Sequence, residues 1–225
     1  MSINMVTPVT AKTINHLNPD AGMLLHDFDI STVKNAQELM QKITSEEGQK
    51  LWFGATKGGI NVQEGRSSWS PSFDSKRMSY KGEERFSGAV PKMTGTLVEF
   101  TPANVRAISG AAEVDDKDKA KIKVQPKATI QSGHYFSNIV FVANNGPDGL
   151  YVAEMKNAMS VSGMNSQSAD QDIATLPFEF VAHSDSPVFT DDLPLTYWFF
   201  GASEEAAAAV AEQVEQEQTD GGAEG

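Results

Sequence analysis

The segment YFSNIVFVANNGPDGLYVAEMKNAM, at residues 135–159, decides the fold class. Two apolar runs, residues 135–143 and 150–159, flank the six residues Asn-Asn-Gly-Pro-Asp-Gly, which are all frequent in turns. Two runs of β-forming residues on either side of such a turn predict an antiparallel hairpin. The sequence therefore favours a β-rich protein that is built around this hairpin.

Other short apolar segments predict further strands. Residues 174–183 alternate, with Leu176, Phe178 and Phe180 on one face and Glu179 on the other, which is typical of a half-buried strand. We also expect strands within residues 20–30, 50–55, 59–64, 94–100, 121–130 and 195–200, and a turn at residues 56–58. The segment LTYWFF at 195–200 is so apolar that we expect it to be buried or covered.

Two short helices are expected between these strands. Residues 31–43 place apolar side chains three or four positions apart, with Ser31 or Thr32 as the N-cap. In the second helix, Thr101 is the expected N-cap and Pro102 takes the first helical position, where its missing N–H costs nothing. Gly110 is the expected C-terminal stop of this second helix.

About ten strands and two short helices indicate a mainly β fold, namely an antiparallel β-sandwich or split barrel with flanking helices and extended loops. Residues 66–85 are polar and form either a long loop or an extended hairpin, and residues 111–121 and 159–172 are expected to be loops. The chain then divides into an extended N-terminal arm at residues 1–19, a β domain at residues 20–201 and an acidic appendage, partly helical or flexible, at residues 202–225.

The chain has 225 residues, and its formal net charge of −12 is concentrated at the C-terminus. Residues 202–225 carry seven acidic and no basic residues, which leaves residues 1–201 with 23 acids, 18 bases and a net charge of −5. Neither part shows the basic stripe with which proteins grip phosphates. Specific binding of nucleic acid is therefore not expected.

The composition also narrows the possible chemistry and location. The chain has no cysteine, which excludes disulfides, thiolate catalysis and cysteine-ligated zinc. No apolar run approaches the roughly 18 residues of a membrane-spanning helix, and residues 1–9 lack the basic and apolar regions of a secretory signal. We expect no membrane association.

No motif predicts an active site. The segment GATKGG at residues 54–59 resembles a phosphate-binding loop but lacks the required order, so a tight turn is favoured. The histidines His16, His26, His134 and His183 stand far apart, without the spacing of metal ligands. We therefore expect no catalytic residue, no cofactor-binding residue and no metal site.

Acidic and aromatic residues offer two weaker candidates for binding. The acidic residues of DDKD at 115–118 and of Asp191-Asp192 lack the loop pattern of a calcium site, so solvated loops are favoured. Trp52 and Trp198 lie in apolar strands and are expected in the core. Trp69 is the expected exposed aromatic, where stacking on a sugar and contact with another subunit are equally possible.

Six short segments between residues 20 and 200 are informative when their order and spacing are taken together. They are DAG at 20–22 with Phe28-Asp29, GATKGG at 54–59, Lys81-Gly82 followed by Arg85, GTLVEFTPANV at 95–105, Lys156-Asn157-Ala158, and LPFEFVAH at 176–183. Their order and spacing resemble the major tail tube protein family of long-tailed, non-contractile bacteriophages. The long insert at residues 66–85, apart from the three residues named at its end, and residues 111–121 and 202–225 lie outside this pattern.

The resemblance implies a β-sandwich or split barrel whose copies form hexameric rings that stack into a hollow tube. Double-stranded DNA would pass through the channel during ejection without being bound specifically. The implied partners are further copies of the chain, the tape measure protein, the tail terminator and the distal tail protein. The implied location is the tail of the virion, which is assembled in the cytoplasm of the bacterial host, and residues 1–18 and 66–85 would contact neighbouring subunits.

Two other functions remain open from the sequence. One is a carbohydrate- or surface-binding β-sandwich module, which would be a soluble monomer with exposed aromatic residues around a shallow groove. The other is the tube protein of a contractile tail or type VI secretion system, which shares the ring-forming architecture and requires a sheath partner. An enzyme is not expected.

We expect the acidic appendage to lie on the outside of any assembly, because a bulky acidic segment would obstruct a channel. Deleting residues 202–225 should therefore leave assembly intact, which electron microscopy of the truncated protein can check. Loss of assemblies upon this deletion would contradict the expectation.

Overall fold

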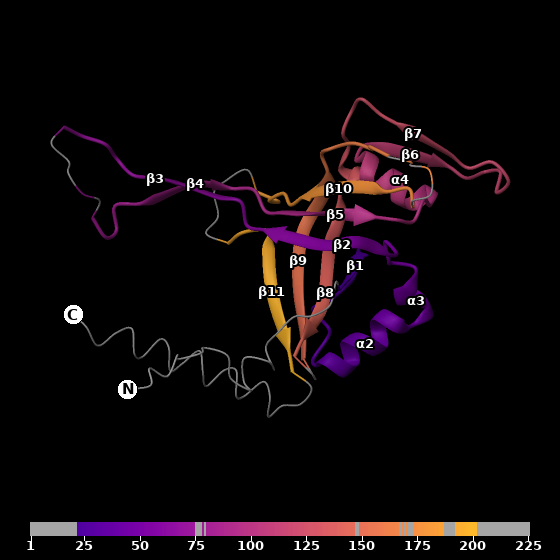
Figure 1. Cartoon of the computed structure of the whole chain (residues 1–225), viewed down its shortest axis with the longest axis horizontal. Helices are drawn as coiled ribbons and strands as arrows, with labels where there is room; N and C mark the ends of the chain where they lie inside the picture. The colour runs from indigo at the N-terminus through magenta and orange to yellow at the C-terminus, as the bar shows by residue number, and fades with distance from the viewer. Residues whose placement is uncertain are drawn as a thin grey trace, which may run out of the picture.

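The computed structural model describes residues 22–201 apart from 75–77, 79, 147–148, 167, 169, 171–172 and 187–191. The expected N-terminal arm at residues 1–19 and the acidic appendage at residues 202–225 lie outside the described residues. The described chain is mainly β, with antiparallel sheets (Figure 1). The largest sheet has seven strands, which are β1 (Met23–His26), β2 (Thr56–Gln63), β5 (Lys92–Leu97), β8 (Phe136–Asn145), β9 (Gly149–Ser160), β10 (Leu176–Val181) and β11 (Leu195–Phe200).

The hairpin expected from residues 135–159 is confirmed as β8 and β9, which pair antiparallel over most of their length. β9 then connects two parts of the sheet. Along one stretch it lies between β8 and β11, and at Met159 and Ser160 it pairs with β10, which leads on to β5 and β2. In Figure 1 the strands β8, β9 and β11 run across the direction of β2, β5 and β10.

Two hydrophobic clusters fill the space on either side of the hairpin. The first lies between the two parts of the sheet and includes Phe53, Met93, Met155 and Phe180, all of them fully buried or nearly so. The second lies on the opposite face of β8 and β9, where Leu39 and other apolar residues of a helix pack against it. The expected alternation of β10 is confirmed, because its residues Leu176, Phe178 and Phe180 are buried.

The first expected helix starts later than predicted. Helix α2 (Ala36–Thr44) begins after Asn35, whose side chain accepts a hydrogen bond from Glu38 N at 2.8 Å. Ser31 is instead held in a turn, because both its N–H and its hydroxyl donate to Asp29 Oδ1. A second short helix, α3 (Glu46–Gln49), follows directly and was not expected.

The second expected helix is confirmed at both ends. Helix α4 (Pro102–Ser109) starts with Pro102, and the Thr101 hydroxyl accepts a hydrogen bond from Asn104 N at 3.1 Å. Gly110 ends the helix with φ of 70°, a left-handed conformation that favours glycine. Local capping signals therefore suffice to define this helix.

The strand expected at residues 50–55 and the turn expected at residues 56–58 are both wrong. Trp52 makes only an isolated bridge to Leu25, and residues 56–58 open strand β2. Gly58 and Gly59 have φ of 85° and 81°, so β2 pairs with β5 through a register shift rather than folding back on the preceding residues. Glycines inside a strand allow such a bulge, and because glycines are also frequent in turns, the sequence predicted a turn here.

Two smaller hairpins extend from the seven-stranded sheet. Of the two alternatives expected for residues 66–85, the hairpin is present where β3 (Arg66–Trp69) pairs with β4 (Arg85–Ala89), and the described residues between these two strands lie outside any strand. The loop expected at residues 111–121 is wrong in its first half, because β6 (Ala112–Asp115) pairs there with β7 (Lys123–Pro126). A single turn of 3₁₀ helix, η1 (Ser132–His134), precedes β8.

Strand β11 is present as expected, but the expectation that it is buried is wrong. Tyr197, Trp198 and Phe199 are 37%, 39% and 60% exposed. The reason is its position, because β11 pairs only with β9 among the described strands and so lies at an edge. The expectation of a core position is therefore wrong for Trp198, while Trp52 is half-buried against the second cluster.

Replacing Leu39 with alanine should lower the free energy of unfolding by about 3 kcal/mol, because this fully buried side chain leaves a cavity between α2 and the sheet. Met40, the next residue of the same helix, is 42% exposed, so Met40→Ala is the matched control and should change stability little. Urea unfolding measures both values. Equal effects of the two substitutions would contradict this packing.

Candidate assembly surfaces

Three strands of the seven-stranded sheet, β1, β2 and β11, each pair with only one other described strand. In β2 and β11, no described strand pairs with the outer edge. The outer edge of β1 is covered, because His26 N donates to Leu51 O and Phe53 N donates to Leu24 O, both at 3.0 Å. Strand β2 pairs only with β5, and strand β11 only with β9. β2 and β11, which we call the edge strands, therefore offer backbone groups for pairing with another chain.

One face of β11 continues an aromatic cluster on β9. The rings of Tyr151 and Tyr197 stack with centroids 6.0 Å apart, and the Phe199 ring lies 5.4 Å from Tyr151. Burial, with a smaller contribution from Tyr197, raises the pKa of Tyr151 to about 12. These rings form an apolar surface that is only partly covered by the rest of the described chain.

The other face of β11 is fixed by a buried polar network. Trp198 Nε1–H donates to Glu154 Oε2 at 3.2 Å, and Glu154 Oε1 accepts from Asn138 Nδ2 at 2.9 Å. Asn138 in turn bonds both the N–H and the carbonyl of Phe28. Because Glu154 and Asn138 are buried, this network holds β11 in one register, so that its exposed edge is presented in a defined position.

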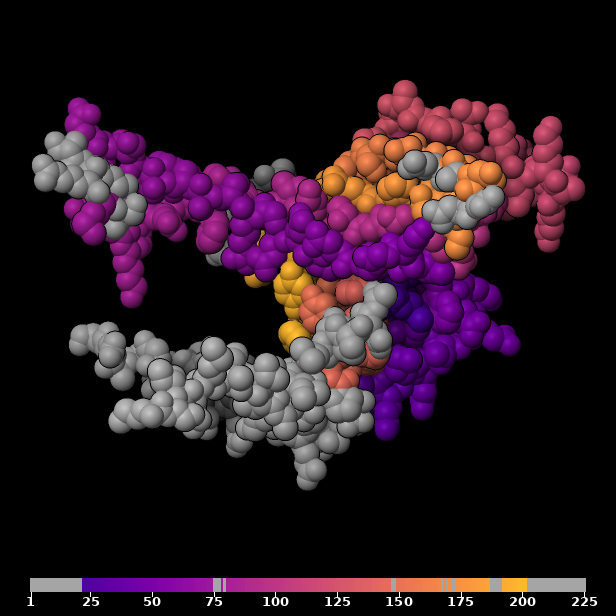
Figure 2. Space-filling view, viewed as in Figure 1, coloured from indigo at the N-terminus to yellow at the C-terminus, as the bar shows by residue number. Residues whose placement is uncertain are grey.

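The β3–β4 hairpin prolongs the β2–β5 pair away from the body (Figures 1 and 2). Val90 N donates to Gly65 O at 3.2 Å, which joins the two paired regions. Every residue of β3 is exposed, and Trp69 is 52% exposed. Two strands alone are marginally stable in water, so this hairpin is a surface that another molecule would stabilise.

The β3–β4 hairpin carries arginine and large aromatic side chains close together. The Arg66 guanidinium lies 5.4 Å from the centre of the Phe86 ring, and Trp69 stands opposite Arg85 in the register. Residues 66–85 carry five bases and three acids, a net charge of +2 in a chain of −12. Arginine and large aromatic residues are enriched at the centres of protein–protein interfaces.

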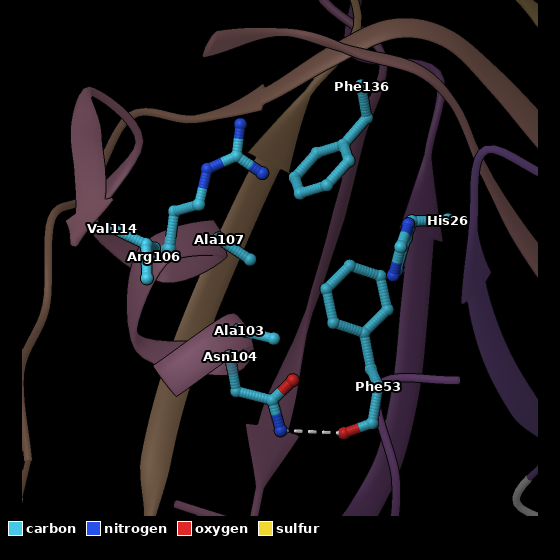
Figure 3. Close-up of a pocket in the computed structure, with 8 residues that line it drawn as sticks. All are labelled: His26, Phe53, Ala103, Asn104, Arg106, Ala107, Val114 and Phe136. Atoms are coloured by element: carbon cyan, nitrogen blue, oxygen red, sulfur yellow. Dashed lines mark hydrogen bonds between the residues drawn. The ribbon is translucent and has the colours of Figure 1, made fainter. Parts of the chain in front are cut away.

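A pocket of about 200 Å³ lies beneath α4 (Figure 3). Its aromatic wall consists of three rings that contact one another, because the His26 ring lies 5.2 Å from Phe53 and 5.3 Å from Phe136. Opposite them, α4 contributes Asn104 and Arg106, and the Arg106 guanidinium lies 5.9 Å from the centre of the Phe136 ring. The pocket thus combines an apolar wall with few polar groups.

Asn104 is the buried polar group of this pocket. Its Nδ2 donates to Phe53 O at 2.8 Å and to Glu99 O at 3.0 Å, which ties α4 to the segments just before β2 and just after β5. Among the described residues, none donates a hydrogen bond to Asn104 Oδ1. This pocket was not expected from the sequence, although an asparagine two positions after Pro102 in an apolar helix is the signal that marks it.

No family model matches this chain. A search of the curated proteins finds no match either. Its function is therefore inferred from the surfaces described above.

The four histidines and the glycine-rich segment are placed as follows. His26 Nδ1 lies 3.0 Å from Asp27 Oδ2, His134 Nδ1 accepts from Gln131 N at 3.0 Å, and His183 Nδ1 lies 3.1 Å from Asn157 O. His16 lies outside the described residues. In the segment at residues 54–59, Ala55 N donates to the Glu99 carboxylate at 2.8 Å, so this backbone N–H is engaged within the chain.

The acidic candidates lie at the end of a strand and in exposed connections. Asp115 ends β6, Asp116 lies in the exposed connection to β7, and Asp191 is outside the described residues. Within the described ranges, no group of three histidine, aspartate or glutamate residues is arranged to hold a metal ion. The same part of the chain contains no helix that is long and apolar enough to cross a membrane.

Replacing Asp27 with asparagine should cost about 1 kcal/mol of stability at pH 7, and this cost should shrink as the pH falls below 4. Burial raises the pKa of Asp27, but hydrogen bonds from the His26 side chain and from Ser137 N outweigh it, so the pKa lies below its ordinary value of 3.8. A lowered carboxyl pKa adds stability above 3.8, which is lost as the pH falls through the folded value.

Urea unfolding of both proteins between pH 3 and pH 7 measures this effect. Asparagine tolerates the positive φ of 51° at position 27, so the backbone is not strained by the change. Asp116→Asn is the control, because Asp116 is exposed and accepts no hydrogen bond from the described residues. A difference between Asp27→Asn and the unchanged protein that stays constant with pH would contradict the assignment.

Proposed function

We propose that this chain is the structural subunit of the tail tube of a long-tailed, non-contractile bacteriophage. The observation that carries the proposal is the pair of unpaired edge strands, of which β11 also exposes Tyr197, Trp198 and Phe199. An apolar edge strand left open to water pairs with other chains, so a protein that keeps one needs a partner to cover it. Further copies of the same chain are that partner.

The positions of the two edges support a ring. Because β2 and β11 belong to different ends of one sheet, a contact between them joins unlike surfaces of two copies. Such a heterologous contact forms a ring when its rotation closes after a whole number of copies, and closure pairs both edge strands of every copy. In this proposal the subunit is a β-sandwich or split barrel, the rings are hexameric, and they stack into a tube.

The outward face of β2, β5 and β10 supports passage of DNA without binding. Thr94 and Thr96 of β5 lie on this face, and Asn61 of β2 stands opposite Thr94. Lys92 on the same face is paired with Glu179, whose carboxylate lies 3.5 Å from its Nζ. A surface of neutral polar groups and paired charge has little attraction for phosphates, which suits the lining of a channel.

The remaining partners and the location follow from the resemblance and belong to the same proposal. They are the tape measure protein, the tail terminator and the distal tail protein, in a virion tail that is assembled in the host cytoplasm. The tube protein of a contractile injection system shares the architecture, and co-purification of a sheath protein with the rings would assign the chain to that class.

A carbohydrate-binding module is the second candidate, and the row of Tyr151, Tyr197 and Phe199 is the observation that favours it. Such rings can stack on sugars. This reading predicts a monomer at all concentrations that binds oligosaccharides through these residues.

Negative-stain electron microscopy of the purified protein should show rings or tubes. Phe199→Lys should abolish them while the chain stays folded, because a lysine on an edge strand blocks pairing and residue 199 is 60% exposed, so that only its ring contact with Tyr151 is lost. Ile130→Lys is the matched control, since Ile130 is 54% exposed outside the strands and helices and its substitution should leave assembly intact. A wild-type protein that stays monomeric would contradict the proposal.

A further inference from the structure

The pocket beneath α4 contains a hydrogen-bond acceptor without a donor. Asn104 is only 4% exposed, and both bonds of its amide are made by Nδ2. Among the described residues, the fully buried side-chain atoms without a partner are Ser109 Oγ and Ser160 Oγ, so Asn104 Oδ1 is open to the pocket. An acceptor that is open to a pocket can receive a donor from the group that occupies it. Figure 3 shows the Asn104 side chain on the same side of the pocket as Ala103, across from Phe53 and His26.

The other walls specify the shape of the occupant. The rings of Phe53, Phe136 and His26 favour a flat apolar group, and the volume of about 200 Å³ is suited to one large side chain. The Arg106 guanidinium donates to Gly133 O at 3.2 Å and lies 5.9 Å from the centre of the Phe136 ring, so it places a cation beside the aromatic wall, where a cation–π contact is best with an indole. A tryptophan side chain meets all three conditions, because it is flat, apolar and carries a single N–H donor.

The chain has three tryptophans, and two of their N–H groups are already used. Trp52 Nε1–H donates to Ile43 O at 3.2 Å, and Trp198 Nε1–H donates to Glu154 Oε2 at 3.2 Å. Trp69 is 52% exposed, and its indole N–H has no acceptor among the described residues. The chain therefore presents a matching donor on β3.

Trp69 and the pocket lie at opposite ends of the molecule. In Figures 1 and 2 the β3–β4 hairpin forms one end of the long axis, while α4 and the β6–β7 hairpin lie toward the other. The two cannot meet within one chain. A contact between them joins two copies and repeats from copy to copy, because each chain has one donor end and one pocket.

We propose that Trp69 of one copy inserts into the pocket beneath α4 of a second copy and donates its indole N–H to Asn104 Oδ1. The inference rests on the proposed self-assembly and adds a contact that is separate from the edge strands. If the edge strands close the rings, this contact links one ring to the next.

Three variants test the insertion by electron microscopy and by native mass measurement of the assembled full-length protein. Trp69→Ala removes the inserted group, and Ala103→Leu fills the pocket from its exposed rim, so each should give single rings and no stacks. Trp69→Phe keeps a ring but removes the donor, and it should give fewer and shorter stacks than the wild type. Because positions 69 and 103 are both exposed, melting temperatures should be unchanged.

Mixing two of these variants gives a sharper result. The Trp69→Ala chain retains a pocket, and the Ala103→Leu chain retains the tryptophan. Their preformed rings should therefore join as pairs of rings, one of each kind, and extend no further. Stacks of either variant alone that are as long as those of the wild type would overturn the insertion but leave the proposed function standing. Absence of rings in the wild type would instead count against the proposed function.

The chain contains no cysteine, so a cross-link can locate the contact directly. Ser68→Cys keeps Trp69 in place, and a short bis-maleimide should join it to Ala103→Cys of another copy in mixed assemblies. Glu47→Cys on α3 is the matched control for the second position, because it is exposed but away from the pocket, and it should not be joined. Equal cross-linking at both positions, or none at position 103, would overturn the insertion.

A free small aromatic molecule is the competing occupant. N-acetyl-tryptophanamide should bind the Trp69→Ala protein and inhibit stacking of the wild type, because it occupies the same pocket. Binding of this probe without any effect on wild-type stacking would assign the pocket to a small ligand and overturn the contact between copies.

Discussion

The rest of the structure depends on the pairing of β9 with strands in two parts of the sheet. Near the end of this strand, Asn157 has a φ of 48°, and its Nδ2 donates to His183 O at 3.3 Å and to Asp185 Oδ1 at 2.7 Å. The His183 ring returns to Asn157 O at 3.1 Å. These bonds fix the chain after β10 against β9, at the place where the sheet changes direction, and asparagine is one of the few residues that adopts a positive φ easily.

This turn in the sheet leaves edges that the described chain does not close. The sheet continues from β9 to β2 on one side and to β11 on the other, and a core fills the space between its two parts. The edge strand β11 is held from within by the Glu154 network, and the edge strand β2 is held by its pairing with β5. A rigid open edge suits repeated association, because little conformational freedom is lost when the contact forms.

The parts of the fold that could be predicted are those encoded by neighbouring residues. The hairpin at residues 135–159, the caps of α4 and the alternation of β10 each follow from local turn chemistry, capping or a period of two. The predictions were wrong where residues far apart in the sequence determine the local structure. Gly58 and Gly59 form a bulge only because β5 lies beside them, and β11 is exposed only because no described strand pairs its outer edge. The pocket beneath α4 joins residues from four distant segments, so no local pattern encodes it.

The central claim is that the edge strands become paired when copies assemble, and amide hydrogen exchange tests it most directly. The exchange of β2 and β11 should be compared between dilute and assembled full-length protein, with helix α2 as an internal reference. Strand pairing slows amide exchange, so the account predicts that assembly protects β2 and β11 while the reference stays unchanged. Equal exchange of both edge strands before and after assembly would contradict it.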